Sequence, residues 1–435
     1  MFPRTEQGVR GMDAKQIRGL KPRLNKFLNE FAGCFTRKDT RMHLKTYVSG
    51  QLSGLQRKSV EPIALEARVP PRTLQNFLSV LSWNHQAVRD RVAEVACRDH
   101  GHPHAVGVID ETSDDKNGRK TPGVKRQWCG SKGKVENCIV TVHLAYATPD
   151  FHCLLDGDLY LPEDWSDDRQ RCREAGIPDD VTYRPKWQIA LELYDRAAAN
   201  GVHLQWLTFD EGYGSKPGFL RGLAARNQWF VGEVPTTFTG WITLPKTTDR
   251  CYRKSRRGRS RRTPRLKAGS LPARSVAHHL RYSPVLRGQP WVRYRVKDGE
   301  KGPIIWEVKH VMLSPADENG LPGAPLHLVV CRNPLDGEIK YFVAHAPPET
   351  PTQIILPIAF SRWKVERCFE DGKQEVGLDH YEGRTWQGLI RHLILSSVSY
   401  LFLAKVHQEQ RGGKTGAVGV PSACGDLSAI DVLVA

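Results

Sequence analysis

The stretch Ala105-Val-Gly-Val-Ile-Asp110 decides how the fold of this chain is interpreted. It is a short apolar run that ends in a carboxylate, which is typical of a strand buried inside a sheet. The stretch His203-Leu-Gln-Trp-Leu-Thr-Phe-Asp210 repeats the pattern. Because α/β proteins place ligand chemistry at the carboxyl ends of strands, Asp110 and Asp210 are candidate site residues. A helix N-cap or a turn residue explains either acid equally well when it is taken alone.

The segments around these two stretches predict an α/β order of elements. Further strands are expected at residues 137–147, 153–161 and 228–234. An amphipathic helix is expected at 187–199, and a short helix follows the glycine-rich turn after Asp210, where the glycines let the backbone come close to another group. Three strands, a helix, a strand, a helix and a strand indicate an α/β core.

The region before this core has the apolar spacing of helices. Residues 16–99 are expected to be helical, and the segment Ile63–Leu78 predicts two helices joined by a short turn. Pro71 is expected to open the second helix, because proline is favoured in a first helical turn. Two interpretations stay open here, a packed helix pair and a helix-turn-helix that enters the major groove of DNA.

The region after residue 235 changes character. Strand-like runs alternate with Gly/Pro turns, which predicts a mostly β insertion, and the helical period returns from Ile354 to about Val406. The predicted division is a helical N-terminal domain that is a candidate for DNA binding (1–100), a first core part (101–235), the β-rich insertion with a basic loop at 250–267 (236–350), a last core part (351–408) and a flexible tail (409–435).

The charge balance of the chain favours a polyanionic partner. Its 435 residues include 64 Lys and Arg against 47 Asp and Glu, a net charge of +17. Nucleic acid is the first expectation and an anionic membrane surface the second. The segment Arg250–Lys267 carries ten of the basic residues and no acid, which predicts a flexible loop able to neutralise several phosphates.

Other features place the chain in a reducing cytoplasm. The ten cysteines include no CxxC pair, which favours buried thiols over a zinc site or a disulfide framework. The sequence has no unbroken apolar run of 18 residues, and its first twenty residues mix charges. We therefore expect neither a membrane-spanning helix nor a signal peptide.

A third acid lies on the predicted C-terminal helix. Arg362, Glu366, Glu370 and Lys373 have spacings that place them within an arc of about 80°. A neighbouring apolar stripe is formed by Val365, Cys368, Phe369 and Val376. A surface ladder of ion pairs explains the charged stripe as well as a site does. Three carboxylates on two strands and a helix could hold two divalent cations about 3.5–4 Å apart for phosphodiester chemistry.

Several motifs together resemble the insertion-sequence 701 family of bacterial transposases, which belong to the DDE superfamily. The resemblance covers about residues 25–405. The matching runs are Val108-Ile-Asp-Glu-Thr112, Gly123-Val-Lys-Arg-Gln-Trp-Cys-Gly130, Gly133-Lys-Val-Glu-Asn-Cys138, Leu159-Tyr-Leu-Pro-Glu-Asp-Trp165, Phe209-Asp-Glu-Gly-Tyr-Gly214, Trp363-Lys-Val-Glu-Arg-Cys-Phe-Glu370 and Gly377-Leu-Asp-His-Tyr-Glu382.

This resemblance implies a ribonuclease-H-like catalytic core of α+β or α/β class, in a metal-dependent enzyme that cuts and joins DNA strands. Asp110, Asp210 and Glu366 would be the catalytic acids and the ligands of two Mg²⁺ or Mn²⁺ ions per active site. Arg362 and Lys373 match a basic signature around the third acid and would contact DNA. The tyrosine of that signature is missing, because Ala359 and Phe360 stand there. The basic-loop residues expected on DNA are Arg253, Lys254, Arg256, Arg257, Arg259, Arg261 and Arg262.

The expected partners are the terminal inverted repeats of a mobile element and its target DNA, bound by a homodimer at the bacterial nucleoid, without a membrane. Trp241, Trp291 and Trp306 of the insertion are candidates for holding a flipped base by stacking, with a place in the core as the alternative. Three other functions stay open: a domesticated DNA-binding regulator that no longer cuts, a nuclease without strand transfer, and a basic DNA-packaging protein.

Overall fold

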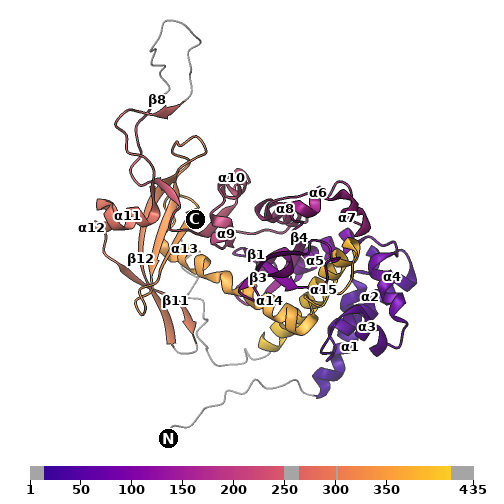
Figure 1. The fold of residues 1–435 in the computed structure, drawn as a ribbon. Coiled ribbons are helices and arrows are strands. Elements are labelled where there is room, and N and C mark those ends of the chain that lie inside the picture. The colour runs from indigo at the N-terminus through magenta and orange to yellow at the C-terminus, as the bar shows by residue number, and fades with distance from the viewer. Residues whose placement is uncertain (1–13, 249–263, 300–301, 413–435) are drawn as a thin grey trace.

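The computed structural model describes residues 14–248, 264–299 and 302–412. Within them the chain forms helices around one long mixed sheet (Figure 1). Most of the basic loop, including its seven predicted DNA-binding residues, lies outside the described residues, as does the predicted flexible tail (409–435) from residue 413 on. Residues 409–412 continue the last helix of the chain, so the tail was predicted to start too early.

The central part of the sheet carries the two acid-bearing stretches side by side. Strand β1 pairs antiparallel with β3 and parallel with β5, and β5 pairs parallel with β6. The expected strands are β1 (Val106–Asp115), β3 (Lys134–Ala147), β4 (His152–Leu159), β5 (Trp206–Phe209) and β6 (Trp229–Val234). One strand, β2 (Lys125–Cys129), was not expected; it pairs with the start of β3 across the Gly130–Gly133 turn.

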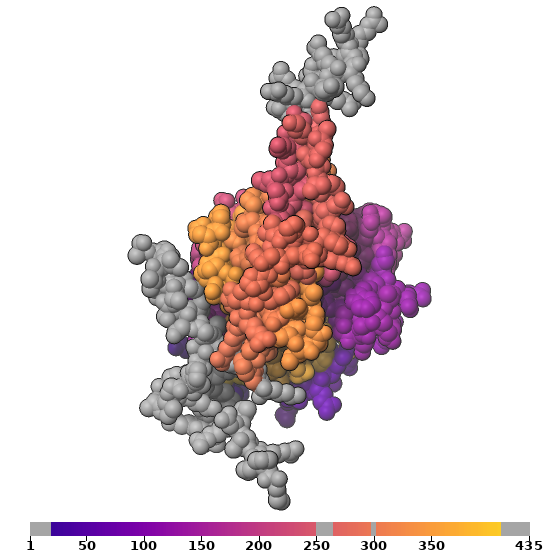
Figure 2. All heavy atoms as spheres, turned by 90° about the vertical axis from the view of Figure 1, so that its left-hand side faces the viewer, coloured from indigo at the N-terminus to yellow at the C-terminus, as the bar shows by residue number. Residues whose placement is uncertain are grey.

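The insertion continues the core sheet instead of forming a separate one. Strand β14 pairs antiparallel with β6, so the strand order is β10-β7-β12-β13-β14-β6-β5-β1-β3-β2, with β11 on β12 and β4 on β3. The strands of the insertion are β7 (Thr239–Trp241), β10 (Arg274–Ser275), β11 (Val292–Gly299), β12 (Gly302–Pro315), β13 (Leu326–Arg332) and β14 (Ile339–His345). The short helices α11 (Val276–Tyr282) and α12 (Pro284–Gly288) pack on it. A separate pair, β8 (Thr247–Thr248) and β9 (Arg265–Leu266), lies towards the far end of the coloured projection that Figures 1 and 2 show rising from the insertion.

The N-terminal helices wrap the last helix of the chain. They are α1 (Ala14–Asn29), α2 (Lys38–Gln51), α3 (Val60–Glu66), α4 (Pro71–Ser79) and α5 (His85–His100), with the turn η1 (Ala32–Cys34), around α15 (Trp386–Gly412). Pro71 opens α4 as expected, and the apolar face of α4 is buried. The buried guanidinium of Arg391 on α15 donates to the carbonyls of Phe77, Leu78 and Leu81. One hydrophobic core therefore runs from the N-terminal helices into the sheet.

Helix α15 is the one described helix that is long and apolar enough to cross a membrane by length and composition. Polar residues such as Arg391 and His392 interrupt this helix, so it contains no unbroken apolar run of 18 residues. In the most apolar window of this helix, 83% is buried inside the protein, as in the core helix of a globular domain.

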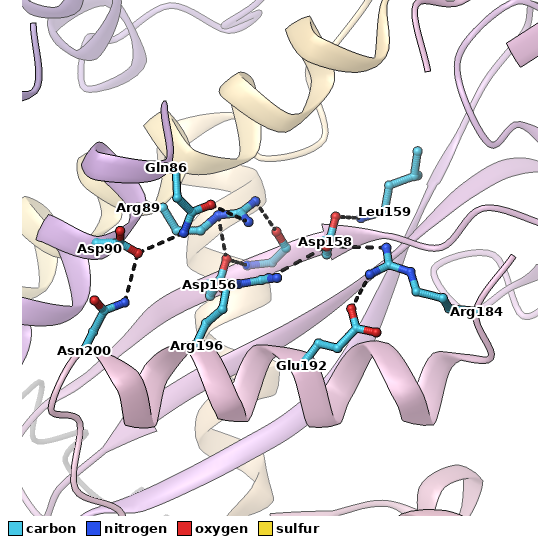
Figure 3. Close-up of polar contacts among 11 residues, drawn as sticks. Gln86, Arg89, Asp90, Asp156, Asp158, Leu159, Arg184, Glu192, Arg196 and Asn200 are labelled. Atoms are coloured by element: carbon cyan, nitrogen blue, oxygen red, sulfur yellow. Dashed lines mark hydrogen bonds and ion pairs between the residues drawn. The ribbon is translucent and has the colours of Figure 1, made fainter. Parts of the chain in front are cut away.

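A buried network of arginines and carboxylates joins the N-terminal helices to the sheet (Figure 3). Arg89 on α5 and Arg196 on α8 (Lys186–Ala199) pair with the same carboxylate of Asp156 on β4, at 3.1 and 2.9 Å. Arg184 and Arg196 also face Asp158 at 3.6 and 3.7 Å. These two acids therefore balance arginines, and they hold α5 and α8 on β4.

The remaining helices lie between strands or lead back into the core. They are α6 (Glu163–Asp167), α7 (Arg169–Glu174), α9 (Glu211–Gly214), α10 (Pro217–Ala225), α13 (Thr352–Ala359), the turn η2 (Phe360–Arg362) and α14 (Trp363–Val376). The expected helices at 187–199 and after Asp210 are α8 and α9. Helix α14 packs against β1 and β4, which brings the third acid back to the two strands.

Candidate active site

Asp110 lies inside β1 and not at its end, because pairing with β3 continues the strand to Asp115 beyond the apolar run; its side chain is almost enclosed. The residue is 8% exposed, and its Oδ1 accepts the backbone N–H of Glu111 at 2.8 Å. Burial raises the pKa of Asp110 to about 7; the charge of Arg362 lowers this pKa, and the charge of Asp210 raises it further. The raised pKa means that burial has removed the water that would stabilise the charged carboxylate. A bound cation or a proton would compensate for this loss.

Asp210 caps the short helix that follows β5. Its Oδ1 accepts the backbone N–H of Tyr213 at 3.2 Å. The helix sits tightly on β6: a Cβ on Gly214 would lie 1.9 Å from the carbonyl oxygen of Glu233. The expectation that glycines here allow a close backbone approach is thus confirmed for Gly214. Strands β5 and β1 are parallel, and Phe209 lies opposite Ile109. The next residues, Asp210 and Asp110, are therefore neighbours across the two strands.

Arg362 links Asp110 to Glu366. Its Nη1 lies 3.0 Å from Oδ2 of Asp110, and its Nη2 lies 3.2 Å from Oε1 of Glu366. The Arg362 side chain is 28% exposed, and that of Glu366 is 59% exposed. One guanidinium therefore connects the first and third predicted acids at the mouth of the site.

The amphipathic character predicted for α14 is confirmed. Val365, Cys368, Phe369 and Val376 are buried. On the charged stripe, Lys373 donates from Nζ to the carbonyl of Ser113 on β1 at 3.2 Å. Glu370 instead forms a half-exposed ion pair with Arg367 at 3.0 Å. The stripe thus splits into residues that contact β1 and residues that form a surface ion pair.

Tyr213 belongs to this site, although the sequence analysis gave it no role. Its side chain is 3% exposed, and its hydroxyl has no hydrogen-bond partner among the described residues. Burial raises its pKa well above the ordinary value, and the charges of Glu111, Asp110 and Asp210 raise it further. The hydroxyl therefore lies within the field of the acids. Its position three residues after Asp210, inside the same turn, was the signal available in the sequence.

The chemistry of the donors suits a hard divalent cation, but the acids are not gathered as a ready-made cage. No group of three or more His, Cys, Asp and Glu side chains close enough to hold a metal occurs in the described part of the chain. Mg²⁺ needs only one or two carboxylates besides water and phosphate oxygens. The buried Asp110 carboxyl, the neighbouring charge of Asp210 and the orphaned Tyr213 hydroxyl fit such a site. In this structure Arg362 provides the positive charge next to Asp110.

Three other predicted features have different surroundings. Trp241 and Trp306 are buried at 4% and 6% exposure, so the core alternative holds for both. The ring of Trp291 is covered by Arg332 and Lys309, whose charged groups lie 4.3 and 4.9 Å from its centre. The rings of Trp241 and Trp306 are therefore not free to stack on a base in this structure.

The residues at the missing tyrosine position also pack into the protein. Ala359 is buried, and the ring of Phe360 lies 5.0 Å from that of Trp306 and 5.5 Å from that of Phe342. His143, which pairs with Asp110 across the strands, is a core histidine, with Nε2 on the hydroxyl of Thr141 at 2.8 Å.

Comparisons with known proteins identify the family of the chain. A family model described as DDE superfamily endonuclease matches residues 30–303. A protein of Microchaete diplosiphon described as a probable transposase for insertion sequence element IS701 is 31% identical over 168 residues, 38% of this chain. The match spans 41% of the length of that relative. A crystal structure of the Mos1 mariner paired end complex with Mn aligns over 51% of this chain and 68% of its own, at 11% identity and a TM-score of 0.16, too low to support an argument.

Proposed function

Because this chain belongs to the DDE superfamily of endonucleases, we propose that it is a DNA transposase that cuts and rejoins the ends of a mobile element. The observation that carries the proposal is the link that Arg362 makes between Asp110 and Glu366, next to the parallel strand that Asp210 follows. The net charge of +17 supports DNA as the partner, since an enzyme of this kind must collect a polyanion around a few acids.

The residues that would hold metal in this proposal are Asp110, Asp210 and Glu366. Bound Mg²⁺ or Mn²⁺, two ions in the full proposal, would activate water or a 3′-hydroxyl and stabilise the leaving oxygen of a phosphodiester. The protein keeps its own carboxylates oriented: the N–H of Glu111 holds Asp110, and the N–H of Tyr213 holds Asp210. Arg362 balances the charge of the acids, so it and a cation compete for the same carboxylate oxygens.

A cleavage assay tests the proposal. The substrate is labelled DNA with the short inverted repeats that flank the gene, with and without Mg²⁺ or Mn²⁺. Asp210→Asn should abolish cutting while DNA binding persists, because asparagine still caps α9 but loses the charge. Asp168→Asn is the matched control: Asp168 caps α7 through the N–H of Arg171 at 3.0 Å, away from the acids, and should cut like wild type.

The other outcomes separate the rival functions. Binding without cutting by well-folded wild type, at several metal concentrations, would point to a domesticated regulator. Metal-dependent cuts that are never joined to a target plasmid would point to a nuclease without strand transfer. Binding with no preference for the repeat ends, and no cutting, would point to a packaging protein. Crosslinking on paired ends tests the proposed homodimer.

A further inference from the structure

A basic pocket lies beyond the acids, where β1 ends. Its volume is about 530 Å³, and its two walls are the loop after β1 and the segment after α14. The residues that line it are Arg57, Asp115, Lys116, Asn117, Gly118, Arg119, Lys120, Thr121, Tyr381, Glu382 and Arg384. Five of these side chains are cationic and two are acidic, so the pocket is positively charged.

The acids of the pocket are already paired, whereas three of its cations are not. Glu382 pairs with Arg57 at 2.7 Å, and Asp115 faces Lys132 at 3.8 Å. The side chains of Arg119, Lys120 and Arg384 are exposed and form no ion pair with any residue that the structure describes. These three charges are therefore available to an external anion.

The loop that carries two of these cations is held in place by its neighbours. Lys116 donates from Nζ to the carbonyl of Tyr381 at 2.7 Å, which joins the two walls. Asn137 on β3 donates from Nδ2 to the carbonyl of Gly118 at 2.9 Å, and Arg171 on α7 donates to the carbonyl of Arg119 at 3.0 Å. An anion would thus meet charges on a positioned backbone, which lowers the ordering cost of binding.

The distance from the acids to the pocket matches a short length of DNA. Asp110 and Asp115 stand on the same strand, and a β-strand advances about 3.3 Å per residue, so they are about 16 Å apart along it. Successive phosphates of one DNA strand are about 3.4 Å apart along the duplex axis. A phosphate in the pocket would thus lie about five nucleotides from the one at the acids.

From these observations we propose that the pocket binds backbone phosphates of the DNA whose scissile phosphate lies at Asp110 and Asp210. This inference rests on the proposed function and extends it with a second contact point on the substrate. The guanidinium groups of Arg119 and Arg384 are suited to bidentate phosphate contacts, and Lys120 adds a point charge. Since phosphate contacts fix register without reading bases, the pocket would set where along the DNA the acids cut.

The test compares two double variants of the full chain. Arg119→Gln with Arg384→Gln removes two pocket charges; Arg41→Gln with Arg287→Gln removes two exposed arginines on α2 and α12 that have no described ion pair. Affinity for repeat-end DNA is measured from low to high salt. The slope of log K against log salt should become shallower by about 0.9 per lost phosphate contact, so by about 1.8 for the pocket variant, and should stay unchanged for the control.

Phosphate ethylation interference gives a second readout. In wild type, ethylation about five nucleotides from the cut should weaken binding, and in the pocket variant this interference should disappear. Wild type that cuts DNA while the pocket variant keeps its slope and interference pattern would refute the pocket and leave the proposed function standing. An equal decrease of the salt slope in the pocket variant and in the control variant would also refute the pocket inference, because net charge alone would then explain the effect.

Two further results are decisive. If wild type neither binds nor cuts repeat-end DNA, the proposed function and the pocket inference fall together. Binding of inorganic phosphate to the pocket can be followed by shifts in the NMR signals of Arg119 and Arg384. If phosphate binds there but DNA affinity does not depend on these residues, the pocket is a site for small anions and the inference is wrong. Thermal unfolding is measured as a control, to check that both variants fold like wild type.

Discussion

The guanidinium of Arg362 lies 3.0 Å from the carboxylate of Asp110, the most buried acid of the site. The same group reaches Glu366 at 3.2 Å, so one side chain from the turn before α14 connects a strand acid with a helix acid. Arg362 therefore contributes positive charge to two of the three candidate acids. The predictions below follow from this arrangement and from the packing that supports it.

Replacing Arg362 by glutamine should abolish or strongly reduce metal-dependent cleavage. The positive charge that lowers the pKa of Asp110 is lost, so this pKa should rise further above about 7. The acid limb of the pH profile of cleavage should therefore move to higher pH. Arg367→Gln on the next turn of α14 is the control, since Arg367 pairs only with Glu370 and Asp371. A profile that does not move would show that Arg362 has no electrostatic effect on the acid.

The contribution of Asp110 to the stability of the metal-free protein should decrease as the pH rises towards neutrality. Burial raises the pKa of Asp110 from 3.8 to about 7 in the folded state, so the folded state holds a proton that the unfolded state has released. Between about pH 4 and pH 7 this makes stability decrease with pH. Asp110→Asn should raise the melting temperature at pH 8 but not at pH 4. A variant that melts below wild type at pH 8 would contradict this account.

Asp156→Ala should be strongly destabilising. It removes the carboxylate that Arg89 and Arg196 share, and leaves the buried guanidinium of Arg89 without its ion-pair partner, which typically costs about 3–5 kcal/mol. Urea unfolding measures the change. Asp164→Ala is the surface control, because its pair with Lys125 at 3.1 Å is half-exposed and worth at most about 1 kcal/mol. Similar losses in the two variants would show that the network contributes nothing special.

Gly214→Ala should destabilise the protein and impair cleavage together. The added Cβ would lie 1.9 Å from the carbonyl oxygen of Glu233, so α9 would have to move off β6 and carry Asp210 with it. In contrast, nothing lies within 4 Å of a Cβ at Gly54, and Gly54→Ala should be close to neutral. Melting temperature and cleavage rate are measured for both. Normal cutting by Gly214→Ala would mean that the position of α9 does not matter for the reaction.

Tyr213→Phe should separate stability from activity. The tyrosine hydroxyl is buried without a described hydrogen-bond partner, so its removal should leave stability unchanged or raise it by about 1 kcal/mol. The hydroxyl lies in the field of the acids, and metal-dependent cleavage should decrease. In Tyr381→Phe a hydrogen bond to the carbonyl of Thr385 at 2.8 Å is lost, so that variant should be destabilised by about 1 kcal/mol. A Tyr213→Phe variant that is destabilised and fully active would reverse the assignment.

The local elements of the site could be predicted because they depend on short-range patterns. The apolar run before Asp110 indicated a buried strand, and the spacing of Arg362, Glu366 and Lys373 placed them on one side of a helix. The glycines after Asp210 indicated a close backbone approach, which the structure contains at Gly214. Periodicity of 2 or 3.6 residues determines which side chains share a face, and no tertiary information is needed for that.

Contacts between distant segments followed only from the tertiary structure. The pairing of β14 with β6 makes the insertion part of the core sheet, and this register depends on strands that are far apart in the chain. Burial of Trp241 and Trp306 was likewise invisible in composition, because a tryptophan in a β segment has the same local pattern whether it is enclosed or exposed. The pocket that contains Arg119, Lys120 and Arg384 likewise depends on segments that are far apart in the chain.

The sequence by itself therefore determined most of the strands and helices and singled out three candidate acids, since these are properties of neighbouring residues and of motifs. The tertiary structure alone decided that Arg362 stands between Asp110 and Glu366, that the Tyr213 hydroxyl faces the acids, and that free cations gather where β1 ends. The physical reason is that charge and burial act through space: they depend on which segments the folded sheet brings together, and not on their order in the chain.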